Sequence, residues 1–374
     1  MVAKSVCSVV CVFASAASAQ PSFETIGYLP GTFQISHAFD VSADGSAVVG
    51  YSTRNGSSDA FRWTSQSGMV ALPTLPGSGN YTATKVSSNG RYAIGSFATS
   101  SSTPGDFVWS EVDGMVAIGS LPGGRDDSTL ATVGNNGMVL GSSSIGFTST
   151  GASLNRAVRW TASGGLEALP LPDAGDIEFQ SVAISTIDDG RIFGRSASGA
   201  WLYSDDTGFE MLDVPDGMNR LNSRGTFLTG RTFNPLNNES TPSYWTAKTG
   251  EVHLPLLSPT DFGQLAGASD DGSVIVGELV STKVVWIDQG NPIQIKDYAI
   301  SLGLDMDGWN ITRIGGVSAD GSTIVGTAYH DDWFSSGEPV VRLEAFVMTI
   351  PAPGAPGAAV VLGCVGLLVV RCRR

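Results

Sequence analysis

Two short segments near the end of the chain carry side chains that could do chemistry. The first consists of His330, Asp331, Asp332, Trp333 and Phe334, which places carboxylates beside aromatic rings. This mixture suits a sugar ring or a cation bound next to one, and a solvated surface loop is the alternative. We therefore treat these five residues as a candidate ligand-binding segment.

The second segment begins like a calcium loop. Asp305 and Asp307 present oxygen ligands at alternate positions ahead of Gly308, as calcium loops do. The distal Glu that completes such a loop is missing, so an ordinary Asp-Gly turn is the alternative. Ca²⁺ is the one cofactor that the sequence suggests.

Enzymatic motifs are absent from the sequence. Its three His residues stand at positions 37, 253 and 330, and it has no Gly-x-Ser-x-Gly elbow, His-x-x-x-His pair or phosphate-binding loop. We expect His37 and His253 to be structural, because each lies in a strand-like run. Carboxylates from distant loops could still meet to cleave a polysaccharide, which keeps a carbohydrate-active enzyme as the alternative.

The elements that must position these segments repeat seven times. Val41–Gly50 recurs as Val317–Gly326 with eight of ten residues identical, and its Asp-Gly pair between β-branched runs predicts a tight hairpin. Looser copies lie between, with hairpin glycines at positions 45, 90, 137, 190, 225, 272 and 321. The steps of 35 to 53 residues between these glycines match the length of a β-propeller blade.

Each repeat contains four strand-like runs. In the first repeat they are His37–Ser42, Ser46–Ser52, Ala60–Thr64 and Met69–Leu72. The third run ends in an aromatic residue in nearly every repeat, and we expect these rings to fill the core between repeats. The sequence therefore predicts an all-β fold over residues 20–350, a seven-bladed propeller of four-stranded blades.

The two ends of the body should close the ring. The seventh repeat stops after its third run, Ala345–Ile350, and has no fourth. Residues Ile26–Gly31 match Ile118–Gly123, the exit from a fourth run, at five of six positions. We therefore predict that Phe23–Leu29 pairs with Ala345–Ile350 and supplies the missing strand.

The connections between runs predict a working surface. Antiparallel strands place the first-to-second and third-to-fourth turns on one face of the ring and all other connections on the opposite face. Loops that vary on a repeated scaffold commonly carry binding, so we predict that the second face, the long-loop face, is functional. The long insertions on it are residues 97–106, 142–156, 173–180, 232–243, 296–310 and 330–342.

Residues 1–19 have the features of a secretory signal. Lys4 precedes an apolar run, and Ala17 and Ala19 form the small-x-small site that signal peptidase cuts. Gln20 is therefore the expected start of the mature chain.

Residues 351–374 have the features of a sorting tail. A Pro-x-Pro signature opens the tail, an apolar run over residues 358–370 follows, and basic residues end it, with enough length for one bilayer helix. The residues of the signature and of the basic end are Pro351, Ala352 and Pro353, and Arg371, Arg373 and Arg374.

This tail resembles the PEP-CTERM sorting tail of bacterial exported proteins, with Ala352 in place of the usual acidic residue. The resemblance implies that an exosortase-like enzyme handles the tail after export. A plain single-span membrane anchor is the alternative.

The body between these ends is acidic and has no Cys. Four of the 21 Lys and Arg residues lie in the ends, which hold no Asp or Glu, so residues 20–350 carry 17 cations against 35 acids. Such a surface repels nucleic acid and anionic membrane, and it suits solubility in an external medium or binding of divalent cations. All four Cys lie in the end segments, so an exported body would depend on its core alone for stability.

The repeats also resemble the HAF family of extracellular repeat proteins. The likeness rests on Leu-Pro-Gly exits, on the Ser-x-Asp-Gly hairpin ending in Val-Gly, and on two triplets, Asp59-Ala60-Phe61 and Glu344-Ala345-Phe346. Asp or Glu heads these triplets where the family has His. Because the family is defined by its repeats, the resemblance implies an extracellular address and no particular reaction.

We therefore expect an exported, non-catalytic protein of the bacterial cell surface or extracellular matrix. Its long-loop face should bind a glycan or a protein. The expected partners are signal peptidase, an exosortase-like sorting enzyme, and an extracellular polysaccharide or surface protein, with no nucleic acid and with the membrane contacted only through the tail. A carbohydrate-active lyase or glycoside hydrolase and a protein–protein scaffold are the alternatives.

Overall fold

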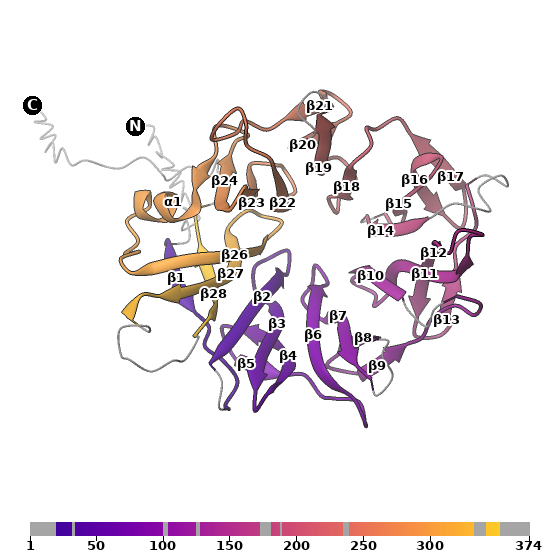
Figure 1. The fold of residues 1–374 in the computed structure, drawn as a ribbon, viewed down its shortest axis with the longest axis horizontal. Helices are drawn as coiled ribbons and strands as arrows, with labels where there is room; N and C mark the ends of the chain where they lie inside the picture. Colours follow the sequence, from indigo (N-terminus) through magenta and orange to yellow (C-terminus); the bar gives the residue numbers. More distant parts are fainter. Residues whose placement is uncertain are drawn as a thin grey trace, which may run out of the picture.

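The seven predicted hairpins organise seven sheets around one channel. In the computed structural model each sheet has four antiparallel strands, which confirms the seven-bladed propeller (Figure 1). The first strand of each blade lies nearest the channel. The structure describes residues 20–31, 34–99, 104–124, 128–172, 181–187, 189–234, 239–332 and 342–351.

The first four blades follow one another along the chain. Blade 1 contains β2 (Ile35–Val41), β3 (Val48–Arg54), β4 (Ser57–Thr64) and β5 (Gly68–Ala71), and blade 2 contains β6 (Gly79–Val86), β7 (Tyr92–Ala98), β8 (Gly105–Ser110) and β9 (Gly114–Ile118). Blade 3 contains β10 (Ser128–Val133), β11 (Val139–Phe147), β12 (Ser153–Thr161) and β13 (Gly165–Ala168), and blade 4 contains β14 (Val182–Thr186), β15 (Ile192–Ser196), β16 (Gly199–Ser204) and β17 (Gly208–Leu212).

The last three blades include the closure of the ring. Blade 5 contains β18 (Met218–Leu221), β19 (Leu228–Asn234), β20 (Glu239–Thr246) and β21 (Gly250–His253), and blade 6 contains β22 (Gly263–Ala268), β23 (Val274–Leu279), β24 (Thr282–Ile287) and β25 (Ile293–Gln294). Blade 7 contains β26 (Trp309–Val317), β27 (Thr323–His330), β28 (Glu344–Thr349) and β1 (Ser22–Thr25).

The Ser-x-Asp-Gly hairpins satisfy their own backbone groups. In blade 1 the Asp44 carboxylate accepts hydrogen bonds from the Ser42 hydroxyl (2.7 Å) and from the backbone N–H of Ser46 (3.0 Å). Gly45 follows with a φ of +73°, which only glycine adopts without strain. The Ser, Asp and Gly residues of the repeat are therefore present because the hairpin turn needs them, as the sequence predicts.

The glycine that ends each Val-Gly pair has a different role. Gly95 of β7 lies opposite Ala83 of β6, and a Cβ at Gly95 would overlap the carbonyl oxygen of Thr82. The register of the two strands then shifts by one residue, which leaves Thr84 unpaired in a β-bulge. Every blade has this bulge, opposite the glycines Gly50, Gly95, Gly141, Gly194, Gly230, Gly277 and Gly326.

Aromatic residues of the third strands fill the core between blades, whereas the tryptophans that end four of these strands are half-buried and pack against that core: Trp63, Trp109, Trp160 and Trp245. Phe61, Phe107, Trp201, Trp286 and Phe346 are each at most 1% exposed. Since a four-stranded sheet alone would expose both faces, packing these rings between blades is what makes the blades stable.

The ring closes through its two ends, which confirms the predicted closure. Strand β1 pairs with β28 in a register that runs from Ser22 opposite Thr349 to Thr25 opposite Phe346. The pairing is shorter than predicted, because the chain leaves the sheet after Ile26. Leu29 instead donates its backbone N–H to the Ser52 hydroxyl of blade 1 at 3.0 Å.

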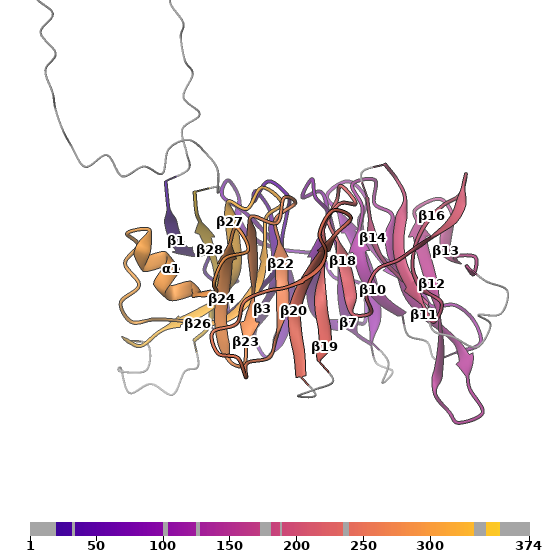
Figure 2. The ribbon, with the colours of Figure 1, turned by 90° about the horizontal axis from the view of Figure 1, so that it is seen from above.

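The predicted insertion at residues 142–156 extends β11 and β12 on one face of the ring (Figure 2). Residues 173–180 and parts of the predicted insertions at 97–106, 232–243 and 330–342 lie outside the described residues. We call the face of the first-to-second and third-to-fourth turns the hairpin face and the opposite one the loop face. The predicted insertion at residues 296–310 connects blades 6 and 7, and it includes most of helix α1 (Ile295–Ser301). Ile295 and Ala299 of this helix are buried in the core with Met306, so the segment is largely committed to packing.

The predicted end segments fall mostly outside the described residues. Residues 1–19, with Ala17 and Ala19, and residues 352–374, with Ala352, Pro353 and the three arginines, are not described by the structure. Within the part that is described, no helix combines the length and the apolar character needed to cross a bilayer.

Replacing Phe23 with Ala should weaken the closure. Its ring packs on Trp309 and Phe346 with centroids 5.2 and 5.1 Å apart. Because Phe23 is half-buried, we expect a loss of about 2 kcal/mol in the free energy of unfolding, below the roughly 3–5 kcal/mol of a fully buried Phe. Urea unfolding measures the change, with Val112→Ala at a 93% exposed position as the control. Equal stability of the two variants would contradict closure by β1.

Replacing Gly95 with Ala should destabilise blade 2. The added Cβ meets backbone on the partner strand, so the bulge must shift, at a cost of about 2 kcal/mol. Gly79 lies in β6 of the same blade with no atom within 4 Å of an added Cβ, so Gly79→Ala should leave the free energy of unfolding unchanged or raise it slightly. Equal free energies of unfolding for the two variants in urea would show that the close approach at Gly95 does not contribute to stability.

Candidate functional site

The predicted ligand-binding segment forms a local cluster at the edge of blade 7. His330 ends β27, and its ring meets that of Trp309 edge to face at 5.0 Å. The backbone N–H of Asp332 donates to His330 Nδ1 at 3.2 Å, and Asn310 donates to the Asp331 carboxylate at 2.7 Å. Trp333 and Phe334 lie outside the described residues.

The predicted calcium ligands lie next to this cluster. His330 Nε2 lies 3.1 Å from the backbone oxygen of Asp307, so the structure brings the two predicted sites together. Asp305 Oδ1 accepts the backbone N–H of Asp307 at 3.0 Å, as in an ordinary turn. Among the residues that the structure describes, no three His, Cys, Asp or Glu side chains are grouped to hold a metal ion. Calcium binding stays a prediction.

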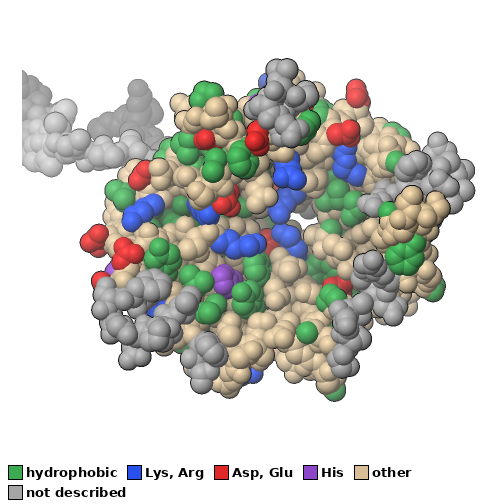
Figure 3. Space-filling view, in the orientation of Figure 1, with side chains coloured by type: hydrophobic (Ala, Val, Ile, Leu, Met, Phe, Trp, Pro, Cys, Tyr) green, Lys and Arg blue, Asp and Glu red, His purple; other side chains and the backbone are tan. Residues whose placement is uncertain are grey.

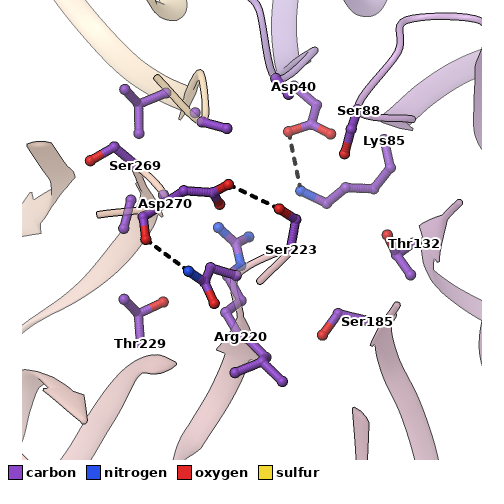
Figure 4. Close-up of a pocket in the computed structure, with 18 of the residues that line it drawn as sticks. Asp40, Lys85, Ser88, Thr132, Ser185, Arg220, Ser223, Thr229, Ser269 and Asp270 are labelled. Atoms are coloured by element: carbon purple, nitrogen blue, oxygen red, sulfur yellow. Dashed lines mark hydrogen bonds and ion pairs between the residues drawn. The ribbon is translucent and has the colours of Figure 1, made fainter. Parts of the chain in front are cut away.

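The central channel holds a set of residues that the sequence interpretation missed. In each first strand the residue after the bulge faces the channel, and it stands five positions before the hairpin glycine. All seven line one cavity of about 230 Å³ (Figure 4). We call them the bulge ring: Asp40, Lys85, Thr132, Ser185, Arg220, Gly267 and Gly316.

A second cavity, of about 390 Å³, continues the channel towards the loop face. It shares Lys85 and Arg220 with the first cavity and adds Arg313 from β26. Glu278 and Lys283, which flank the connection between β23 and β24, also line it, so this cavity opens among the loops. We call it the mouth cavity. Figure 3 shows Lys and Arg side chains gathered around this opening.

The charges at the mouth cavity are only partly compensated. Lys85 lies 3.5 Å from Asp40, whereas Arg220 and Arg313 are exposed and form no ion pair with a described residue. Attraction to Asp40 raises the pKa of Lys85, but burial and the charges of Arg220 and Arg313 outweigh it, and the net pKa is lowered. The cations therefore repel one another and leave positive potential that an anion would neutralise.

Aromatic rings adjoin these cations. The guanidinium of Arg313 lies 4.5 Å from the centroid of the Phe39 ring, and Phe39 lines the mouth cavity. The Tyr51 ring is 5.7 Å from that of Phe39 and 4.9 Å from that of His37. Burial, and then the charge of Arg313, lower the pKa of His37, so its imidazole is neutral at neutral pH. His37, which the sequence predicts to be structural, lies 3.1 Å from the Thr327 hydroxyl through its Nδ1 and also adjoins the cations.

One sequence signal could have revealed this site. Aligning the seven repeats on their hairpin glycines and comparing the position five residues earlier gives the whole bulge ring at once. Arg313 stands eight residues before Gly321, at the position that His37 occupies before Gly45. These residues stand out when equivalent positions of the seven repeats are compared. A search along the chain finds each of them only as an isolated charged residue.

Comparison with known proteins supports the fold. No family model and no curated protein matches the chain. Among solved structures, it resembles an oligogalacturonate lyase from Vibrio parahaemolyticus at 12% identity and a TM-score of 0.55, covering 90% of this chain and 99% of that one.

Two further similar structures are more distant. A virginiamycin B lyase from Staphylococcus aureus matches at 14% identity and a TM-score of 0.49 over 88% of this chain and 100% of that one. TolB from Acinetobacter baumannii matches at 10% identity and a TM-score of 0.43 over 83% of this chain, which spans 65% of the TolB chain.

Replacing Arg313 with Gln should raise the pKa of His37. The variant removes the smaller of the two causes of the lowered pKa, so the value should rise yet stay below the usual 6.5. Proton NMR titration of the imidazole measures the change, with His253→Gln and His330→Gln assigning the three His signals. Arg91→Gln, on the hairpin face, should leave the pKa of His37 unchanged. An unchanged value in Arg313→Gln would contradict the contact.

Proposed function

We propose that this protein is an exported β-propeller that binds an acidic glycan at the mouth cavity without turning it over. The body would act at the bacterial cell surface or in the extracellular matrix, placed there by its signal segment and its sorting tail. The observation that carries the proposal is the group of cations at the centre of the loop face.

The charge distribution supports an anionic ligand. The whole chain has a net charge of −14, yet Lys85, Arg220 and Arg313 converge on one cavity. A concave site with low-dielectric walls focuses such a potential and draws in ligands of opposite charge. Arg220 and Arg313 form no ion pair with a described residue, so an anion bound between them would gain electrostatic attraction to both.

The types of side chain support a carboxylated sugar. Arginine presents planar donors that match a carboxylate in two parallel hydrogen bonds. Phe39 lines the mouth cavity beside Arg313 and provides apolar ring surface, against which the apolar face of a sugar ring would pack. The mouth cavity, at about 390 Å³, lies within the roughly 300–1,000 Å³ of small-ligand sites.

The position of the ends supports presentation outward. Ser22 at the start of β1 pairs with Thr349 at the end of β28, so both ends of the body leave the ring together. They do so on the hairpin face, opposite the loop face (Figure 2). A tail held in a membrane would therefore direct the mouth cavity away from that membrane.

Replacing Arg220 and Arg313 together with Gln should abolish most binding. Isothermal titration of the full-length protein with a galacturonate tetramer measures affinity, and the methyl-esterified tetramer gives a neutral ligand of the same shape. We expect the acid form to bind and the ester to bind at least tenfold more weakly. The double variant should lose about tenfold for the acid form, because two charge-assisted contacts are removed.

Arg91→Gln is the matched control for this experiment, since it removes one guanidinium from the hairpin face and should leave affinity unchanged. Equal binding of the acid and the ester would overturn the anionic ligand. Formation of unsaturated products or new reducing ends would replace the binding role with that of a carbohydrate-active enzyme.

A further inference from the structure

Three adjoining cavities on the loop face form one path. The mouth cavity shares Arg220, Gln264 and Leu265 with a cavity of about 220 Å³ between blades 5 and 6, which Arg231 also lines. On its other side it shares Lys283 with a cavity of about 330 Å³ between blades 6 and 7. Lys296 of helix α1 lines that third cavity. We call this path the cationic track.

The track collects cations from several blades. Of the 17 Lys and Arg residues of the body, six line its three cavities, whereas Glu278 is the one acid among the described residues that line them. In the body as a whole, acids outnumber cations about two to one. The six are Lys85, Arg220, Arg231, Lys283, Lys296 and Arg313.

The track is longer than one charged group. From Gln264 on β22 to Lys283 on β24 the path crosses two strand spacings of blade 6, and α1 follows the fourth strand of that blade. At about 4.8 Å per spacing, the span from the channel to α1 is roughly 14 Å. A ligand that fills the track is therefore an extended chain.

We propose that the loop face binds a linear acidic polysaccharide along the cationic track, with successive carboxylates held by Arg231, by the mouth cavity and by Lys296. This proposal rests on the proposed function and adds a polymeric ligand with several subsites. The Phe39 ring, which lines the mouth cavity, favours a glycan whose sugar face packs on it.

The charge balance also disfavours nucleic acid as the occupant. A duplex carries about one charge per 1.7 Å of its axis, so most of its phosphates would lie beyond the cationic track, on a body in which acids outnumber cations about two to one. A glycan with one carboxylate per sugar has a lower charge density and keeps its charges within the track.

Galacturonate oligomers of one to six residues test the track on the full-length protein. Affinity should rise with length until the track is filled and then level off, because each added carboxylate gains a subsite. Lys296→Gln and Arg231→Gln should each weaken the hexamer about threefold and leave the monomer unchanged, since they hold only the outer carboxylates.

One variant should act in the opposite direction. Glu278 forms an ion pair with Lys283 at 2.9 Å, so Glu278→Gln removes the acid of the track and frees a cation. We expect about a threefold gain in affinity for the hexamer. Lys248→Gln, in the turn between β20 and β21 on the hairpin face, is the control and should change nothing.

The outcomes separate the two proposals. If Arg220→Gln weakens every oligomer while affinity is independent of length and of Lys296 and Arg231, the mouth cavity stands and the track is overturned. If no oligomer binds, both fail. Tighter binding of a single-stranded DNA of equal charge than of the hexamer would overturn the glycan as the ligand of the track.

Discussion

The close approach between the first two strands of each blade is the constraint on which the rest of the structure depends. A glycine in the second strand lets the carbonyl of the first strand come near, and a bulge follows in the same place seven times. A bulge increases local twist and redirects the side chains beside it. Because the bulge recurs in every blade, it directs one residue per blade into the channel. The glycine of the Val-Gly ending recurs in the sequence because this close approach between strands requires it.

This arrangement separates the residues that stabilise the fold from the residues that are available to bind a ligand. The hairpin Ser, Asp and Gly residues, the second-strand glycine and the third-strand aromatics supply the turns and the core, so they recur. The bulge ring contributes little to that core. It therefore varies from Asp and Lys through Ser and Thr to Gly without changing the blade. Repeat proteins commonly bind ligands through residues that vary on a constant scaffold. In this protein such variable residues line the channel as well as the loops.

The fold could be predicted almost in full, and the site could not. The number of strands and the number of blades follow from the local periodicity of the sequence. The closure follows from the last repeat, which lacks a fourth strand. His330, Asp331 and Asp332 are candidates from the sequence because acids there adjoin aromatic residues, and the structure gives them hydrogen-bond partners near blade 7. Arg220 and Arg313 are 93 positions apart in the sequence and meet only across the ring. The two arginines come together because the ring closes. Their proximity can therefore be predicted only after the repeats are arranged as blades around a common axis.

In the proposed binding role, the acidic body and the cationic centre act together on ligand choice. An acidic surface alone would repel every polyanion, and a cationic patch on a neutral surface would accept most of them. Six of the 17 cations of the body are gathered along one path across the loop face, so attraction of an anion is strongest along that path. Specificity is a difference between affinities, and repulsion of the wrong ligand contributes to it as much as attraction of the right one. A chain with modest charge density that lies along the path gains the attraction, whereas a densely charged one also meets the repulsion. In the proposed role, the acidic composition therefore contributes to the selectivity of the site.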